Sequence, residues 1–308
     1  MDGILLVDKE GGETSYETSY DVVKKVKKAL RGSNVKKVGH AGTLDPLATG
    51  LLIILVGQGT KLSSYIMSEK KKYSATVTLG IETDTLDSDG KIVQERDVPI
   101  LSREALLNVF TAFTGEIEQT PPAFSAVKVD GVRAYKLARK GEAVALKKRR
   151  VNIYSLKLTG MDLPELTMEV ECSGGTYIRS LAADLGRTAG PGGHLKALRR
   201  MAIGPFLARD GMSSSDIVSW DKRMKDRIIP LNEAIPDMRE VRVAPRVASH
   251  IRCGRQPTWE DLGVDAATRS MTTGRLKMVE SGQLVAIARI ERDEEVGHGE
   301  VKLERVFG

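Results

Sequence analysis

The sequence is poor in the residues that build most metal and disulfide sites. Its 308 residues include only two cysteines and four histidines. Cys172 and Cys253 lie far apart, without CxxC spacing and without a nearby set of histidines. Zinc sites, zinc-dependent deaminases and disulfide frameworks need such ligands at close spacing. We therefore expect no disulfide framework and no metal ion.

Long apolar segments are also missing. The longest apolar run, residues 51–56, is far shorter than the roughly 20 residues that a membrane-spanning helix needs. The first ten residues, MDGILLVDKE, do not have the basic and then apolar plan of a signal peptide. We therefore expect no membrane association and a cytoplasmic location.

Positive charge is present in excess and is clustered. The chain has 47 Lys and Arg against 41 Asp and Glu, a net charge of +6. Residues 128–150 alone hold nine basic and two acidic residues, and residues 21–37 hold seven basic residues and one acidic residue. Such clusters are typical of a protein that binds a polyanion, although a solvated charged surface accounts for either cluster by itself.

Strand and helix patterns are mixed along the first 235 residues. Strict alternation of apolar and polar residues predicts strands at 72–79 and 166–172. Helical spacing predicts helices at 22–30, 102–115 and 178–185 and suggests another at 194–201. These elements do not follow the regular alternation of a doubly wound fold. The sequence therefore predicts an α+β fold with a mixed, largely antiparallel sheet and flanking helices.

The last 70 residues have a different sequence pattern. Prolines at 230, 236 and 245 precede short β-like segments, and glycines at 254, 274 and 282 provide turns between them. With 41% apolar residues in the chain, two unequal domains are compatible with this length. We place the boundary between residues 238 and 239, which leaves a small β-rich domain at 239–308.

The most informative segment is GHAGTLDPLATG, residues 39–50. Its glycines and proline constrain a polar loop just before the apolar run, so Asp45 is expected on a turn at the edge of a buried strand. Loops attached to a rigid sheet commonly carry catalytic groups. Asp-Pro is equally a common turn former, and the loop alone leaves both interpretations open.

Five sequence blocks, taken together, resemble one family. They are ILLVDKEGGETS, GHAGTLDPLATG, KKYSATVTLG with ETDTLDSDG, CSGGTYIRSLAADLG and HLKALRRMAIGPF. In this order, over about residues 1–235, they resemble the TruB family of tRNA pseudouridine synthases, and residues 239–308 resemble the small PUA RNA-binding module. The resemblance implies a pseudouridine synthase fold and isomerisation of uridine 55 in the T loop of tRNA, without a cofactor.

The resemblance also implies catalytic roles for Asp45, Tyr73 and Arg179. Asp45 would be the nucleophile, because a carboxylate can form and break a bond to carbon. A carboxylate in a buried pocket needs a neighbouring cation to remain ionised, and Arg179 is expected there. Tyr73 would stack on the target base and act as base for the C5 proton. Attack at C1′, addition at C6 and a glycal-like intermediate stay open.

Further residues are assigned to substrate binding by the same resemblance. His40 would fill the gap left when the target nucleotide is flipped out. Tyr177 and Leu198 would line the uracil pocket, and Lys9 would brace the Asp45 loop or the RNA. Residues 128–150 would form a clamping insertion that becomes ordered on RNA binding. Contacts with the RNA backbone are expected from Lys147, Lys148, Arg149, Arg150, Arg199 and Arg200.

The sequence departs from the family pattern at three places. Glu10 stands where the family has proline, and Ala41 stands where it has threonine. The tetrapeptide ETSY occurs twice in tandem, at residues 13–16 and 17–20. This duplication leaves open whether Thr14-Ser15 or Thr18-Ser19 takes the family position.

The sequence leaves two other functions open, and it contains one group of residues that resembles a calcium site. A guide-RNA-dependent rRNA pseudouridine synthase and a non-catalytic tRNA-folding chaperone are the alternatives to a stand-alone tRNA enzyme. We expect a monomer that acts on the T-arm stem-loop without guide RNA. Asp84, Asp87 and Asp89 resemble calcium ligands but lack the bidentate glutamate of a calcium loop, and we assign them to a surface turn.

Overall fold

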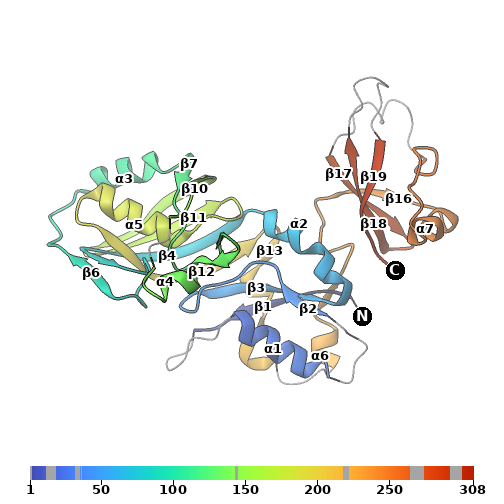
Figure 1. The fold of residues 1–308 in the computed structure, drawn as a ribbon, viewed down its shortest axis with the longest axis horizontal. Helices are drawn as coiled ribbons and strands as arrows, with labels where there is room; N and C mark the ends of the chain where they lie inside the picture. Colours follow the sequence, from blue (N-terminus) through green and yellow to red (C-terminus); the bar gives the residue numbers. More distant parts are fainter. Residues whose placement is uncertain are drawn as a thin grey trace.

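The computed structural model describes residues 2–11, 19–31, 35, 37–142, 145–217, 222–263, 274–291 and 300–308. The described chain contains one 11-stranded sheet and a separate four-stranded sheet near the C-terminus, which lie side by side in Figure 1. No helix among these residues is long and apolar enough to cross a membrane.

The large sheet is mixed and mostly antiparallel, as predicted. Only β1 with β14 and β3 with β12 pair in parallel among the pairs of this sheet. Its main order is β14 (Met212–Ser213), β1 (Gly3–Lys9), β3 (Thr49–Val56), β12 (Gly193–Ile203), β4 (Lys71–Leu79), β11 (Glu165–Cys172), β10 (Arg149–Asp162) and β7 (Gly115–Gln119). Three further strands pair at its sides: β2 (Val38–His40), β13 (Phe206–Leu207) and β15 (Ile228–Pro230).

Helices and short hairpins surround this sheet. The helices are α1 (Ser19–Ala29), α2 (Ser63–Ser68), α3 (Arg103–Ala112), α4 (Ala134–Ala138), α5 (Ile178–Ala189) and α6 (Lys222–Lys225), with 3-10 turns η1 (Gly57–Leu62), η2 (Ala208–Asp210) and η3 (Ser214–Asp216). The hairpins are β5 (Ile81–Thr83) with β6 (Ile92–Glu95), and β8 (Lys128–Val129) with β9 (Val132–Arg133). The Ser102 hydroxyl accepts a hydrogen bond from the Ala105 amide (3.1 Å) and caps α3.

Strand β3 is buried on both faces, which explains its uninterrupted apolar sequence. Leu52 and Ile54 belong to the core beneath α1 and α5, whereas Leu51 and Ile53 belong to the core on the opposite face. Strand β4 is buried on one face only, so apolar and polar residues alternate along it. The Asp45 loop leads directly into β3, and its C-terminal end is therefore tied to a strand that is buried on both faces.

The expected helix at 194–201 is wrong, because these residues lie in β12. The pairing of β12 with β4 shifts register between Leu195 and Ala197. A bulge adds one residue to a strand, so buried side chains recur there at a spacing of three and not two. Leu195 and Leu198 are both buried as a result, and their spacing imitates that of a helix.

The C-terminal residues form the second sheet, in the order β16 (Arg239–Arg242), β17 (Gly274–Glu280), β18 (Gln283–Glu291) and β19 (Glu300–Val306), with α7 (Pro245–Arg252) beside it. Ile287 and Phe307 from this part pack in one core with Leu51 and Ile53 of the large sheet. The Tyr65 hydroxyl of α2 also bonds to the Glu304 carboxylate at 2.8 Å. The β-rich part is thus docked on the larger one.

Candidate active site

Asp45 and Arg179 meet although they are distant in sequence. Asp45 lies on the loop between β2 and β3, and Arg179 lies in the first turn of α5. The guanidinium donates two hydrogen bonds to the carboxylate, from Nε to Oδ2 (2.9 Å) and from Nη2 to Oδ1 (3.1 Å). The Arg179 side chain is 5% exposed and that of Asp45 is 32% exposed. A buried cation thus holds a carboxylate that solvent, and a substrate, can reach.

Arg179 is in turn held by three further groups. It donates to the carbonyl oxygens of Thr85 and Phe124, each at 3.0 Å, and its Nη1 lies 3.5 Å from Oδ2 of Asp87. Because Arg179 bridges two carboxylates and two carbonyls, its orientation is set from several sides.

Asp87 is a residue whose importance the sequence patterns did not show. The surface-turn assignment is wrong for Asp87, since its side chain is only 7% exposed. Its pKa is raised by burial, while the bond from Thr85 and the charge of Arg179 act in the opposite direction. The turn folds inward because the Leu195 amide bonds to the Leu86 carbonyl (3.1 Å). The place of Asp87 inside the block ETDTLDSDG was the available signal.

Tyr73 points from β4 toward the same site and is 9% exposed. Burial raises the pKa of its hydroxyl, and the nearby Arg200 lowers it. The phenol is therefore protonated at neutral pH, which makes it a weak base before any substrate binds.

Tyr177, at the start of α5, is fixed by two residues from other strands. The Gln119 side chain bonds the Tyr177 backbone twice, accepting from its amide (2.8 Å) and donating to its carbonyl (2.9 Å). The Arg149 guanidinium lies 4.4 Å from the centre of the Tyr177 ring. Gln119 is 1% exposed and was not identified from the sequence. It aligns the first turn of α5, from which Arg179 projects.

Arg200 has a different place from the one expected. It is 2% exposed, and its guanidinium donates to the carbonyls of Leu51 (2.7 Å), Gly42 (3.0 Å) and Thr43 (3.3 Å). A guanidinium engaged in this way is not available to an RNA phosphate, so the expected backbone contact of Arg200 is not supported. Arg200 thus supports the backbone of the Asp45 loop.

The other expected binding residues line the same region. Lys9 is fully buried and its Nζ donates to the carbonyls of Pro46 and Ala48, so it braces the Asp45 loop. His40 lies on β2, and both burial and Arg200 lower its pKa, which favours a neutral ring. Leu198 is 7% exposed on β12, in one core with Tyr73.

The basic residues expected to contact the RNA backbone differ in their exposure and in their partners. Lys148 and Arg150 are 67% and 75% exposed and lie near Glu118 (3.9 Å) and Glu116 (3.3 Å) of β7. Lys147 is exposed, whereas Arg149 turns inward onto Tyr177. Arg199 is partly exposed and makes a two-bond pair with Asp8 (2.6 and 3.0 Å).

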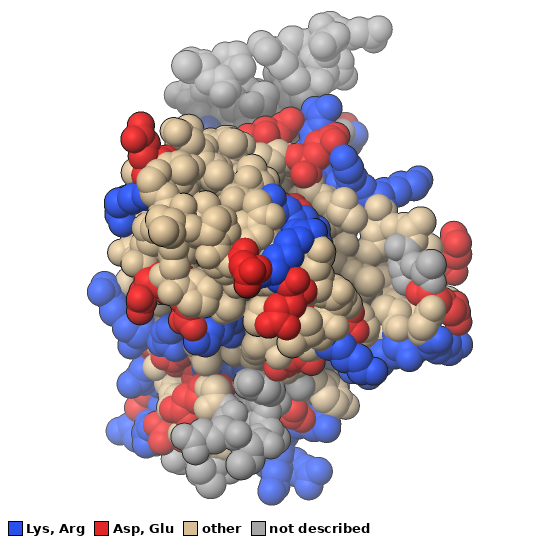
Figure 2. Space-filling model, turned by 90° about the vertical axis from the view of Figure 1, so that its left-hand side faces the viewer, with Lys and Arg blue, Asp and Glu red and all other residues tan. Residues whose placement is uncertain are grey.

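Charge is unevenly distributed over the surface. Figure 2 shows the end of the molecule that carries β6 and α3, where uncharged residues cover a broad area. Ile92 and Val93 of β6 and Leu107 of α3 are exposed at 60%, 63% and 44%. This end is therefore not a continuous basic surface.

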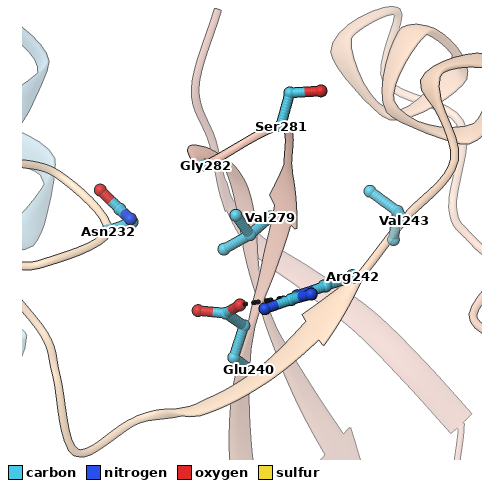
Figure 3. Close-up of a pocket in the computed structure, with 7 residues that line it drawn as sticks. All are labelled: Asn232, Glu240, Arg242, Val243, Val279, Ser281 and Gly282. Carbon is cyan, nitrogen blue, oxygen red and sulfur yellow. Dashed lines mark ion pairs between the residues drawn. The ribbon is translucent and has the colours of Figure 1, made fainter.

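A cavity lies apart from the Asp45 site, beside the second sheet. This cavity of about 480 Å³ lies between the linker residue Asn232 and the second sheet, and its lining includes Glu240, Arg242 and Val279 (Figure 3). Its one marked ion pair, between Arg242 and Glu240, spans 3.5 Å. None of the Asp45 site residues lines it. Across the described ranges, no group of three His, Cys, Asp or Glu side chains could hold a metal ion.

Comparisons with known proteins show which family the chain resembles. A model described as "TruB family pseudouridylate synthase (N terminal domain)" matches residues 27–178, and one described as "tRNA pseudouridylate synthase B C-terminal domain" matches residues 179–236. The chain is 39% identical over 290 residues to a tRNA pseudouridine synthase B of Geobacter sulfurreducens, covering 94% of this chain and 93% of the relative. It is 38% identical over 317 residues to the protein of the same name from Syntrophus aciditrophicus, covering 100% and 99%.

Among solved structures, a chain of a Cbf5-Nop10-Gar1 complex is similar with a TM-score of 0.73 and 24% identity. The match covers 99% of this chain and 85% of that one. At this identity the likeness concerns the fold, including both the large sheet and the C-terminal β-rich part.

Proposed function

The chain belongs to the TruB family of pseudouridylate synthases, and on that premise we propose that it isomerises uridine 55 in the T loop of tRNA with Asp45 as nucleophile. The observation that carries the proposal is the Asp45–Arg179 pair, in which a reachable carboxylate sits on a buried guanidinium. The curated relatives named above are tRNA enzymes by name, which supports tRNA as the substrate.

We propose a task in the reaction for each residue of the site. The glycosidic bond between N1 and C1′ of the target uridine breaks and its electron pair stays on N1. The uracil turns, C5 forms a bond to C1′ and loses its proton to a base, and N1 takes up a proton, so the product is an isomer of the substrate. Asp45 presents an oxygen to the sugar or to C6, and Arg179 keeps that carboxylate in one orientation. Tyr73 and Leu198 bound the space in which the freed uracil turns. Because no electrons are gained or lost, the reaction needs no redox partner.

The surroundings of the Asp45 loop are proposed to restrict its motion. The residues that hold the Asp45 loop are buried, so the carboxylate does not have to be reorganised when the base arrives. A neutral His40 fits insertion among stacked bases better than a charged ring does, since a charge would lose its water there.

Exposed basic residues are proposed to bind the RNA backbone, and Lys147, Lys148 and Arg150 are the outward-facing members of their cluster. Replacing these three by Ala is expected to flatten the slope of log K against log salt by roughly 2 to 3 units, at 0.7 to 0.9 per phosphate. The single-turnover rate at saturating RNA should change little, because these residues position RNA without meeting the base.

Equilibrium titrations of a T-arm hairpin at several salt concentrations measure this slope. Replacement of Lys222, Arg223 and Lys225 of α6 by Ala removes the same charge elsewhere and is the matched control. Parallel lines for the wild type and the Lys147, Lys148 and Arg150 variant would contradict the backbone contact.

The ETSY duplication gives a separate prediction. Deleting residues 17–20 or residues 13–16 yields the same protein, and we expect a folded enzyme with a turnover rate within about threefold of wild type. Shortening a loop by four residues changes its closure entropy by well under about 1 kcal/mol. The melting temperature and the turnover rate are the measurements. A large loss of either would show that the extra copy is needed. Apart from Ser19 and Tyr20, the duplicated segment lies outside the described residues.

One experiment separates the proposed function from its alternatives. The purified protein is incubated with a T-arm hairpin alone, and the modified base is mapped. Pseudouridine at position 55 without any other RNA supports a stand-alone enzyme, in which residues 239–308 are proposed as an RNA-binding domain of a monomer. Activity only with an added guide RNA, or binding without modification, would support the guide-dependent enzyme or the chaperone.

A further inference from the structure

We propose that Ser19 is a positioning residue that sets the direction of the Asp45 side chain through the peptide group before it. This inference rests on the proposed role of Asp45. Ser19 begins α1, belongs to the second copy of the duplicated tetrapeptide and is 2% exposed. Among the described residues, its hydroxyl bonds to Leu44 and not to the Asp45 carboxylate.

The Ser19 hydroxyl binds both polar backbone groups of Leu44. It accepts a hydrogen bond from the Leu44 amide at 2.8 Å and donates one to the Leu44 carbonyl at 3.2 Å. Leu44 is itself 3% exposed. Because water has little access to this site, no solvent molecule readily takes over the two bonds if the hydroxyl is lost.

The Leu44 carbonyl belongs to the same planar unit as the Asp45 amide nitrogen. A peptide group is rigid, so fixing its oxygen also fixes the plane in which the Asp45 nitrogen and Cα lie. The direction of the Asp45 Cα–Cβ bond then varies only with rotation about one backbone bond. A hydrogen bond one residue away thereby limits where the carboxylate can point, and the two bonds from Arg179 restrict the remaining side-chain rotation.

Three buried side chains from separate elements hold this loop together. Arg200 of β12 binds the carbonyls of Gly42 and Thr43, and Lys9 of β1 binds those of Pro46 and Ala48. Ser19 binds the residue between these pairs, directly before Asp45. The Asp45 carbonyl is bonded within the loop, by the Ala48 amide at 3.0 Å. Ser19 thus completes the set of contacts on the N-terminal side of the nucleophile.

The Ser19–Leu44 hydrogen bonds also show which copy of the tetrapeptide contacts the Asp45 loop. Ser19 of the second copy supplies the hydroxyl that reaches Leu44. If one copy of ETSY is deleted, the remaining copy still places a serine two residues before Asp21. The deletion described above and a Ser19 substitution are therefore expected to give opposite results.

The test is Ser19→Ala. Loss of both bonds should lower the single-turnover rate at saturating T-arm hairpin by about 10- to 100-fold, as small misplacements of reacting groups do. The dissociation constant of the hairpin should stay within about threefold, because no RNA-binding group changes. Ser19→Thr retains a hydroxyl and should recover most of the rate. A Ser19→Ala rate within threefold of wild type would overturn the proposal.

Ser102→Ala is the control, because it removes an exposed hydroxyl bond that caps another helix, away from the site. It should lower the melting temperature without a comparable loss of rate. If both variants lost rate equally, Ser19 would act only through stability and the proposal would fail. Should Ser19→Ala not fold, Ser19→Cys carries the same expectation, since a thiol is a weak donor and acceptor.

A second measurement does not depend on catalysis. Hydrogen exchange of a peptide that spans the Asp45 loop should show a Leu44 amide protected in the wild type and at least about tenfold less protected in Ser19→Ala, because its acceptor is gone. Equal exchange in the two proteins would overturn the proposal even if the wild type did not modify the hairpin. Wild-type inactivity on the hairpin would count against the proposed function alone.

Discussion

Replacement of Asp45 by Asn is expected to abolish isomerisation while leaving the affinity for tRNA nearly unchanged. The amide keeps the volume of the side chain and one acceptor for Arg179, but it cannot act as a nucleophile at carbon. Removing a nucleophile from an enzyme commonly costs more than about 10³-fold in rate. Because Asp45 is partly exposed, the loss of one ionic hydrogen bond should alter stability only slightly.

Tritium release from C5-labelled tRNA measures the rate, and a binding titration measures the affinity. Asp216→Asn is the control, since Asp216 forms an ion pair with Arg223 on an exposed part of the surface. It should behave as wild type in both assays. Residual turnover of Asp45→Asn within tenfold of wild type would remove Asp45 from the role of nucleophile.

Arg179→Lys is expected to lose both activity and stability. The guanidinium serves the two Asp45 oxygens, the Thr85 and Phe124 carbonyls and Asp87 at once, which a single ammonium cannot do. Misorientation of Asp45 should lower the turnover rate by about 10²-fold or more. Buried carbonyls left without donors should cost about 2 to 4 kcal/mol in the free energy of unfolding.

The two variants are expected to differ in melting temperature although both lose turnover rate. Asp45→Asn should lose rate at an almost unchanged melting temperature, whereas Arg179→Lys should lose rate and melt several degrees lower. Arg187→Lys is the control on the same helix, because Arg187 pairs with Glu82 but is half exposed. A stable, active Arg179→Lys protein would show that positive charge alone, without the fork of hydrogen bonds, suffices at this position.

Local sequence patterns were enough to predict the fold class. The two residues of the central Asp45–Arg179 pair were predicted from the sequence blocks that contain them. Alternation along residues 72–79 predicted β4, and the apolar run at residues 51–56 predicted a buried strand, because burial selects side chains at the periods of the elements they occupy. The blocks that contain Asp45 and Arg179 identified the family. Resemblance therefore paired residues that no periodicity could have paired.

The tertiary structure alone decided which polar residues are buried and what they bind. Asp87 and Arg200 have sequence surroundings typical of a turn and of a basic surface, yet both are buried among partners from distant strands. Gln119 carries no sequence signal, and the sequence left open whether Ser19 takes the family position. The importance of both residues lies in the backbone groups of Tyr177 and Leu44 that they reach. Such contacts depend on sheet register, bulges and loop packing. These arise from interactions between segments far apart in the chain, which a local sequence pattern does not encode.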